Sequence, residues 1–399
     1  MPRVLVVSEA SINRPHRRAY DLLARQPGWE VHIVAPRRLP TGSSYKLCEP
    51  APADAGYQLH QLMMALPRVP RFQWFVGLAA VAARIRPDVA FVEWDAGSWP
   101  VLQAWLATRP FRCPVVTYTV ENIRRNRWTN ARVAAARGAV ASAAKEATAG
   151  VLDALGLRVM SGLASVNEDG IAIYRNDRGW RGPVEFVPLG TDLTLFRPMD
   201  MTDLRRELGL EGSFVVGYFG RLIPEKSVHR LVEALPGLGG DVKLLLDVFT
   251  NFAPGSYAAE LLTSAQRLGV RQRVVTVDVG HEDVPRYMNC CDAVVLPTVT
   301  TDRVKEQFGR VLTEAMACEI PVVGSTCGSI PFLIGDAGWV FPEGDFEAMV
   351  DTIRALRRNV ADREVRRKAG RERVRRLFSV EAQRDALMRI FAQVGCPGC

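Results

Sequence analysis

The chain has 399 residues, of which 48% are hydrophobic and 24% charged, and its formal net charge is +8 at pH 7. This length allows two domains of about 200 residues, each with its own core, and this composition excludes extensive disorder. The sequence contains no run of about 18 apolar residues, and its first residues lack the apolar region of a signal peptide. We therefore expect a cytoplasmic protein without membrane-spanning helices.

The positive charge is concentrated in the N-terminal half. Residues 1–180 contain 23 Lys and Arg against 14 Asp and Glu, a net +9, whereas residues 181–399 contain 28 against 29, a net −1. Either the arginines form a solvated surface, or this half meets an anionic substrate or the negatively charged inner face of a membrane. Arginine clusters occur at Arg14, Arg17 and Arg18 and again at Arg124, Arg125 and Arg127. They lack regularly interleaved aromatic residues, so nucleic acid is not an expected partner.

The eight cysteines do not indicate the disulfide framework of a small secreted domain. We expect most of them to be small buried thiols. The C-terminal pair Cys396-Pro-Gly-Cys399 has CxxC spacing, but no second CxxC and no His pair completes a zinc site. No metal site is therefore predicted.

Short β-branched runs alternate with segments long enough for helices, in two successive series. The first predicted strands are residues 4–7, 31–35, 89–93, 114–119 and 162–166, with helices over 16–26 and 73–86. The second predicted strands are residues 215–220, 243–248, 273–278, 293–298 and 321–325. Nearly continuous apolar runs are typical of buried parallel strands, and their alternation with helices predicts two doubly wound α/β domains.

The two series meet in a Pro- and Gly-rich segment, residues 184–200, which a new helix follows at Thr202. We therefore place an N-terminal domain at residues 1–190 and a C-terminal domain at residues 191–377. The last amphipathic helix, about residues 378–395, either packs back on the N-terminal domain or belongs to the core of the second domain.

The first motif that carries chemistry is the βα unit VVGYFGRLIPEKSVHRLVEAL, residues 215–235. Ligands of doubly wound folds bind at the carboxyl ends of strands. Gly220 would let the backbone approach a ligand there, and Arg221 and Lys226 would face its phosphates with charge-assisted hydrogen bonds. The alternative is that both cations are ordinary surface residues near the start of a helix.

The second motif, EQFGRVLTEAMACEIPVVGS, places Glu306 and Glu314 eight positions apart. A helix is predicted to begin at Phe308 or Gly309, so Glu306 precedes a helix N-terminus, where backbone amides favour anions. Glu314 lies inside the helix, on the order of 10 Å from Glu306. This separation suits two ends of one ligand and does not suit a shared-proton dyad.

Together these segments resemble the signature set of the retaining glycosyltransferases of family 4, the glycosyl transferases group 1. The resemblance rests on Glu306-x7-Glu314, on GRLIPEK and on VPLGTDLTLFRP, residues 187–198, and it extends over about residues 184–345. It implies the GT-B fold, in which two Rossmann-like domains face each other across a cleft. It further implies that the N-terminal domain binds the acceptor and that the C-terminal domain binds a nucleotide-sugar donor, UDP- or GDP-sugar.

Carried over by position, the resemblance implies that each glutamate holds one end of the donor. Arg221 and Lys226 would hold the diphosphate, Glu314 would bind the ribose hydroxyls, and Glu306 would lie beside the transferred sugar. The resemblance further implies donor contacts from Gly220, from the backbone amides of Phe308 and Gly309, and, for the base, from Val279, Gly280 and His281. Glu306, Arg221 and Lys226 would be the catalytic set, and the two cations would stabilise the departing diphosphate without a metal.

The acceptor side departs from the family pattern. The Gly-rich loop that often follows the first strand is replaced by SEASINRPHRRA, which offers Asn13 and His16. The remaining acceptor candidates are polar residues at predicted strand ends: Glu93, Asp95, Glu121 and Asn122. Alternatively, these residues cap helices or are simply exposed to solvent. A role in acid or base chemistry would require one of them to lie within hydrogen-bond reach of the acceptor hydroxyl.

The resemblance thus implies a retaining, hexosyl-type glycosyltransferase that moves a sugar from its nucleotide donor to a hydroxyl, or another nucleophile, of a small-molecule or lipid-linked acceptor. The basic N-terminal half favours an anionic acceptor and allows peripheral membrane contact. No cofactor besides the donor substrate is expected. Two alternatives stay open: a sugar-nucleotide epimerase of related fold, and a non-catalytic protein that binds nucleotide-sugars.

Overall fold

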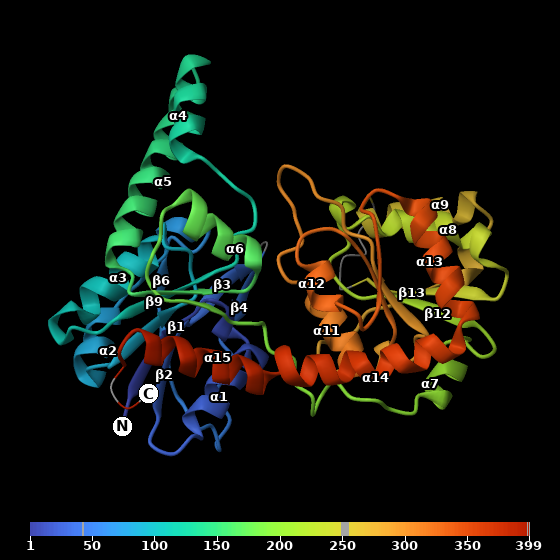
Figure 1. Ribbon diagram of the computed structural model, residues 1–399, viewed down its shortest axis with the longest axis horizontal. Coiled ribbons are helices and arrows are strands. Elements are labelled where there is room, and N and C mark those ends of the chain that lie inside the picture. Colours follow the sequence, from blue (N-terminus) through green and yellow to red (C-terminus); the bar gives the residue numbers. More distant parts are fainter. Residues whose placement is uncertain (42–43, 249–254, 397, 399) are drawn as a thin grey trace. The chain divides into compact units, whose positions relative to one another are not determined.

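The computed structural model describes residues 1–41, 44–248, 255–396 and 398. The contacts divide the chain into two units, shown in Figure 1. Unit 1 comprises Met1–Gly190 and Val380–Cys399, and unit 2 comprises Thr191–Ser379. The chain therefore leaves unit 1 inside the Pro- and Gly-rich segment and returns to it for its last helix.

Unit 1 is built on a seven-stranded parallel sheet of order β11-β10-β9-β8-β1-β2-β5. Its strands are β1 (Arg3–Val7), β2 (Glu30–Pro36), β5 (Gln58–Leu62), β8 (Val89–Val92), β9 (Val115–Thr119), β10 (Gly162–Ser165) and β11 (Val184–Phe186). The residues of β8, β9 and β10 are all buried, which explains why these strands are continuous runs without polar alternation. The strand order reverses between β1 and β8, the place where such sheets bind ligands.

Helices cover both faces of this sheet. They are α1 (Arg18–Ala24), α2 (Leu78–Ile85), α3 (Trp99–Thr108), α4 (Arg127–Ala136), α5 (Val140–Val159), α6 (Glu168–Ala172) and α15 (Val380–Gln393). The C-terminal helix α15 packs on α1, β10 and β11, and its Phe391 ring lies 5.9 Å from Phe91 and 6.4 Å from Trp29. The last helix therefore belongs to the core of unit 1.

Two short antiparallel pairs lie beside this sheet, β3 (Arg38–Thr41) with β4 (Ser44–Leu47), and β6 (Met64–Ala65) with β7 (Trp74–Phe75). The second pair corrects one prediction, because the helix expected over residues 73–86 begins only at Leu78. Gly77 has a φ of 91° and precedes that helix as its N-cap. A left-handed φ of this kind favours glycine and interrupts helical geometry.

Unit 2 is built on a six-stranded parallel sheet of order β14-β13-β12-β15-β16-β17. Its strands are β12 (Phe214–Tyr218), β13 (Val242–Asp247), β14 (Val274–Val277), β15 (Ala293–Leu296), β16 (Val322–Ser325) and β17 (Trp339–Phe341). Its helices are α7 (Thr202–Glu207), α8 (Val228–Leu238), α9 (Tyr257–Arg267), α10 (Val284–Met288), α11 (Arg310–Ala317), α12 (Ile330–Ile334), α13 (Phe346–Arg358) and α14 (Val360–Leu377). The strand order reverses between β12 and β15, so both units are Rossmann-like and doubly wound.

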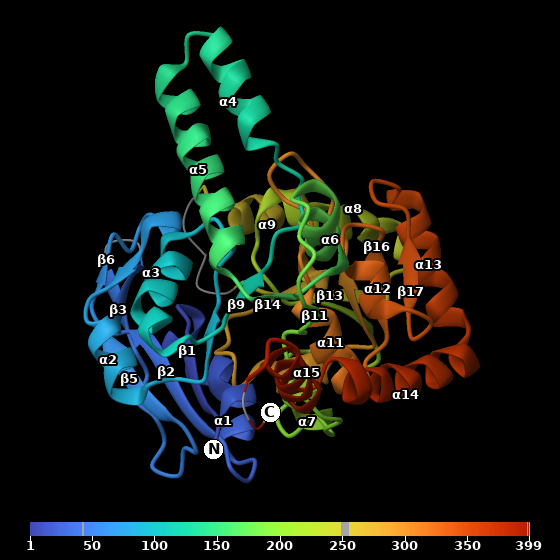
Figure 2. The ribbon, with the colours of Figure 1, turned by 60° about the vertical axis from the view of Figure 1, so that its left-hand side comes forward.

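Helices α4 and α5 pair with each other and project from unit 1 as a helical hairpin, as Figure 2 shows from a second side. In the described part of the chain, no helix is long and apolar enough to span a bilayer.

Candidate active site

The two sequence motifs of the second half meet where the strand order of unit 2 reverses. Lys226 ends the short turn η6 (Pro224–Lys226) after β12, and Glu306 lies between β15 and α11. Lys226 Nζ forms an ion pair with Glu306 Oε2, and Thr298 Oγ1 donates to the same oxygen from 3.1 Å. The two charged side chains are only 11% and 10% exposed. A pair so well buried is costly to break, since removing one partner leaves the other uncompensated.

The loop after β16 positions the backbone of Glu306. Ser329 N donates to Glu306 O at 3.1 Å, Ser329 Oγ donates to Gln307 O at 2.8 Å, and Glu306 N donates to Cys327 Sγ at 3.4 Å. Gly328 has a φ of +57°, and a Cβ there would lie 2.1 Å from Glu306 O. Only glycine therefore fits at this position without moving the loop that carries Glu306.

Glu314 sits within α11, one turn after the helix begins. Gly309 caps this helix with a φ of 75°, and the preceding Phe308 is buried. Arg310 Nε donates to Glu314 Oε1 at 3.1 Å. Burial raises the pKa of Glu314, and the Arg310 guanidinium opposes that rise. The pair places the Glu314 carboxyl group in the first turns of α11.

The loop expected to meet a base, which holds Val279, Gly280 and His281, connects β14 to α10. The His281 ring lies 5.8 Å from the ring of Phe196. Burial lowers the pKa of His281, and the charge of Arg310 lowers it further. Arg310 therefore acts electrostatically on both His281 and Glu314, which places this loop beside the start of α11.

Gly220 and Arg221 are both exposed at the carboxyl end of β12. Gly220 has a φ of 151°, and the hydroxyl of Tyr218 donates to Arg221 O at 2.9 Å. The predicted donor residues of unit 2 thus all lie at the carboxyl ends of β12, β14 and β15 or at the start of α11.

The acceptor candidates of unit 1 lie at the carboxyl ends of its strands, in two groups. Glu93, just after β8, accepts hydrogen bonds from Ser8 Oγ and from the hydroxyl of Tyr20. Burial raises the pKa of Glu93, and these two hydrogen bonds oppose the rise. Asn13 and His16 lie in the segment after β1, where Asn13 Oδ1 is buried and has no hydrogen-bond partner among the described residues.

The second group joins the ends of β8 and β9. Thr119 Oγ1 donates to Asp95 Oδ1 at 2.6 Å, and Arg178 clasps Glu121 with bonds of 2.7 and 3.1 Å. Burial, followed by the charge of Glu121, raises the pKa of Asp95 to about 7. Asn122, the next residue of this loop, is buried.

The structure adds polar residues that the sequence analysis did not select. Gln73 Nε2 donates to Glu9 Oε2 at 2.7 Å, and Trp94 Nε1 donates to Gln73 Oε1 at 3.0 Å. Burial raises the pKa of Glu9. Glu9 is the second residue after the first predicted strand, and that position was the available signal. Gln73 was hidden because it fell inside the helix expected over residues 73–86.

Most cysteines of the described chain are buried thiols, as the sequence predicts. Six cysteines of the described chain are free and buried: Cys48, Cys113, Cys290, Cys291, Cys318 and Cys327. The CxxC pair includes Cys399, which lies outside the described residues. Among the described residues, no three His, Cys, Asp or Glu side chains gather closely enough to hold a metal ion.

Asp95 offers a pH-dependent test of this arrangement. Because its pKa rises from 3.8 to about 7 on folding, the folded protein binds more protons than the unfolded chain between these values. The carboxyl therefore reduces stability as the pH rises through this window, by up to about 1.4 kcal/mol per pH unit. We expect Asp95→Asn to gain stability relative to the parent between pH 4 and pH 7, measured by urea denaturation at each pH. Identical pH profiles of the two proteins would contradict the buried placement of this carboxyl.

Residues 200–373 match the family model of glycosyl transferases group 1. The chain is 31% identical over 177 residues to the capsular polysaccharide biosynthesis glycosyltransferase CapM of Staphylococcus aureus, covering 43% of each protein. It is 33% identical over 162 residues to a D-inositol 3-phosphate glycosyltransferase of Segniliparus rotundus, covering 38% of this chain and 34% of that protein. The matched region thus spans less than half the length of these curated relatives.

Solved structures match over nearly the whole chain at lower identity. Sucrose-phosphate synthase from Thermosynechococcus elongatus has a TM-score of 0.73 and 20% identity, with 99% of each chain covered. HepE of Anabaena, in complex with UDP, has a TM-score of 0.73 and 19% identity, with 98% of this chain and 100% of that chain covered. These likenesses confirm the predicted α/β fold, in which two Rossmann-like units form a GT-B protein.

Proposed function

We propose that this chain is a group 1 glycosyltransferase that takes its sugar from a nucleotide-diphosphate donor and retains the anomeric configuration. The observation that carries the proposal is the buried Lys226–Glu306 pair at the strand-order reversal of unit 2, inside the segment that matches the family model. The names of the curated relatives support glycosyl transfer. The complexes of HepE with UDP and with UDP-glucose support a nucleotide-sugar donor.

Lys226 suits a diphosphate because its ammonium group has three donors. One donor meets Glu306, so further donors remain for phosphate oxygens. Arg221, exposed at the end of β12, adds a second cation. As the bond between sugar and diphosphate breaks, negative charge grows on the leaving group, and preorganised cations stabilise that charge without a reorganisation cost. In this proposal no divalent metal is needed.

The two glutamates have separate tasks. Glu306 is held by Thr298 and by the loop after β16, so its carboxylate is oriented to accept a hydroxyl hydrogen of the transferred sugar. Glu314 would accept the ribose hydroxyls, and the hydrogen bond from Arg310 opposes the rise in its pKa that burial causes. The start of α11 adds backbone amides that favour the distal phosphate.

Unit 1 would bind the acceptor through hydroxyl groups. The carboxyl ends of β1, β8 and β9 carry Glu9, Glu93, Asp95 and Glu121, and carboxylates accept hydroxyl hydrogens but repel phosphates. The pKa of Asp95, raised to about 7 by burial, suits exchange of a proton with an acceptor hydroxyl near neutral pH. A phosphate or another anion of the acceptor would meet the basic residues elsewhere in unit 1.

A thermal-shift panel of UDP, GDP, ADP and dTDP, each with and without EDTA, tests the donor site. A ligand at a hundred times its dissociation constant stabilises the folded protein by about 2.7 kcal/mol, which corresponds to a shift of several degrees for a unit of this size. We expect one nucleotide to raise the melting temperature and EDTA to leave that shift unchanged. If none of the nucleotides acts, the donor proposal fails, and if EDTA abolishes the shift, the metal-independent part fails.

The same protein, incubated with the matching nucleotide-sugar and no acceptor, separates transfer from epimerisation. An epimerase converts the sugar into its isomer under these conditions, and NMR detects that isomer directly. We expect no isomer to form.

A further inference from the structure

The tip of the hairpin formed by α4 and α5, defined as residues 132–145, has an unusual surface. In this segment all residues except Ala134 and Ala143 are exposed. It contains three cations, Arg132, Arg137 and Lys145, and no acidic residue. The other members are Ala, Val, Gly and one Ser, and the two valines, Val133 and Val140, are 45% and 74% exposed. A solvated helix surface usually mixes both signs of charge, whereas this tip carries only positive charge beside exposed valines.

The base of the hairpin is firmly anchored. The carboxylate of Asp153 in α5 forms ion pairs with three arginines from different segments of unit 1. The distances from its oxygens to the guanidinium nitrogens are 3.0 Å for Arg71, 3.6 Å for Arg127 and 3.8 Å for Arg178. Arg127 also pairs with Glu146 across the hairpin at 3.2 Å. This set of buried and half-buried charges fixes both helices where they leave the domain.

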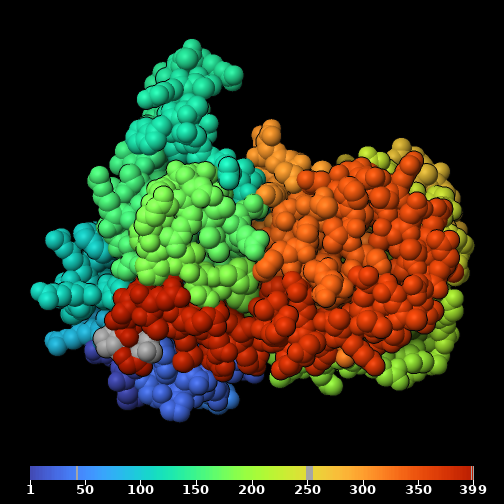
Figure 3. Space-filling view, viewed as in Figure 1, coloured from blue at the N-terminus to red at the C-terminus, as the bar shows by residue number. Residues whose placement is uncertain are grey.

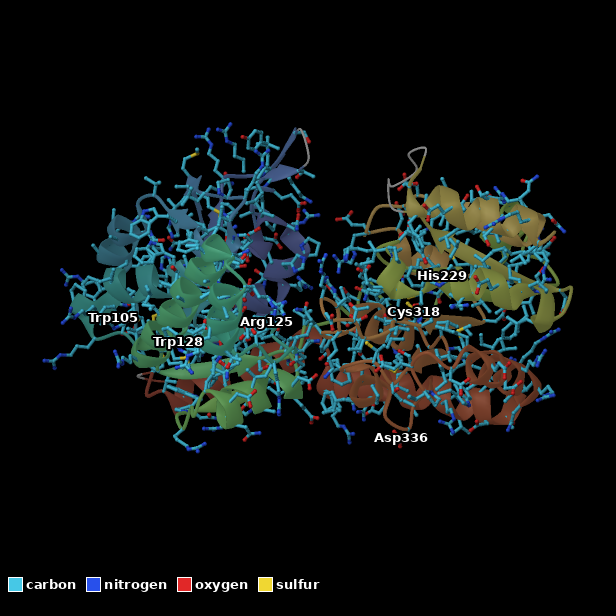
Figure 4. All side chains as sticks on the ribbon, turned by 90° about the horizontal axis from the view of Figure 1, so that it is seen from above. Trp105, Arg125, Trp128, His229, Cys318 and Asp336 are labelled. Atoms are coloured by element: carbon cyan, nitrogen blue, oxygen red, sulfur yellow. The ribbon has the colours of Figure 1, made fainter. Side chains whose placement is uncertain are left out.

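Close packing reinforces the anchor. A Cβ at Gly156 would lie 1.8 Å from the carbonyl oxygen of Ala96, so α5 touches the backbone that follows β8. A Cβ at Gly150 would lie 3.0 Å from the indole of Trp128, which is labelled in Figure 4. These contacts anchor the base of the hairpin, and Figure 3 shows its tip standing clear of the rest of unit 1.

We propose that this tip docks on an anionic lipid surface. Its three cations would meet headgroup phosphates, while Val133, Val140 and the alanines would enter the boundary between headgroups and acyl chains. A second copy of the chain is a poor occupant, because two tips of the same charge would repel each other. Nucleic acid would use the cations but not the exposed valines.

The anchor gives this docking a consequence for the acceptor side, which rests on the proposed function. Arg178 contacts Asp153 of the hairpin and clasps Glu121 at the end of β9. The acceptor candidate Glu121 therefore lies at the base of the hairpin whose tip is proposed to meet the membrane. About 20 Å of α5 separates Val140 at the tip from Asp153 at the base, so a lipid-linked acceptor would need a headgroup or carrier long enough to extend that far from the bilayer.

Co-sedimentation of the full chain with vesicles tests the proposal. The probes are vesicles of phosphatidylcholine alone and of phosphatidylcholine mixed with phosphatidylglycerol. The tip variant carries Arg132→Gln, Arg137→Gln and Lys145→Gln, and the matched control carries Arg86→Gln, Arg112→Gln and Arg181→Gln, three exposed cations elsewhere in unit 1.

We expect the parent to bind anionic vesicles far better than neutral ones, and the tip variant to lose on the order of a hundredfold in partition coefficient. The control variant should stay within about threefold of the parent, because its cations lie outside the contact. Val133→Asn combined with Val140→Asn should weaken binding without any change of charge.

Three results would overturn the proposal. They are equal binding to neutral and anionic vesicles, an equal loss in the control variant, and a dimer in sedimentation velocity that the tip substitutions dissolve. The nucleotide thermal shift of each variant is recorded in parallel, since the donor site lies in unit 2. A lost nucleotide shift with intact vesicle binding would count against the proposed function and leave the docking proposal standing.

Discussion

Lys226→Met and Glu306→Gln are each expected to lower the rate of sugar transfer by at least about a hundredfold, as removal of one preorganised electrostatic contact does in other enzymes. Each single variant should also lose about 3 kcal/mol of stability, because it leaves one charge of a nearly buried pair uncompensated. The double variant should recover most of the stability, since neither buried charge then remains. It should not recover activity, because the cation that is proposed to face the diphosphate is still missing.

Urea denaturation measures the loss of stability, and initial rates measure the loss of activity. The unfolding transition of unit 2 is the one whose midpoint rises when nucleotide is added to the parent. Lys243→Met is the matched control. That lysine lies near the amino-terminal end of β13, whereas the candidate site lies at the carboxyl ends of the strands of the same sheet. Lys243 Nζ donates to Gly209 O. The control should keep full activity. A double variant as active as the parent would mean that the Lys226–Glu306 pair is only structural.

Gly328→Ala is expected to reduce kcat/KM by about tenfold to a hundredfold, since misplacement of a site group by about 1 Å has effects of this size. The new methyl group would lie 2.1 Å from Glu306 O and 3.0 Å from Glu306 N. The loop must therefore move, and it carries Glu306 away from its position. The left-handed φ of +57° adds backbone strain of roughly 1 kcal/mol.

Gly344→Ala separates the two causes. Gly344 also has a left-handed φ, +82°, but a Cβ there meets nothing within 4 Å. This control should lose a similar amount of stability from strain and no activity. Equal activity of the Gly328→Ala and Gly344→Ala variants would contradict the role assigned to the loop after β16.

The fold was predictable because its signals are local. Continuous apolar runs indicated the strands near β1, β8, β12 and β15, and parallel strands bring their carboxyl ends to one edge of a sheet. Lys226 and Glu306 are 80 positions apart, yet both follow strands that flank the reversal of strand order. Their meeting follows from topology, whereas their roles toward a donor stay predictions.

Other features depend on contacts that no local pattern announces. Gln73 reaches Glu9 from the position just before β7, a strand that pairs with β6 across the connection of residues 66–73. Asp153 forms ion pairs with arginines that lie 25 to 82 positions away in the sequence. The alanine-rich hairpin lacks a wide apolar stripe, because nearly all side chains of residues 132–145 are exposed, and so its two helices gave no clear periodic signal.

The dissociation constant of the nucleoside diphosphate found by the thermal-shift panel, measured calorimetrically in EDTA, tests the central claim most directly. The parent should bind one equivalent, and the Lys226→Met/Glu306→Gln protein, folded by its urea midpoint, should bind at least about tenfold more weakly, since charge-assisted bonds to phosphate contribute about 1.5–3 kcal/mol each. Equal affinity of the two proteins would contradict a donor diphosphate site at Lys226.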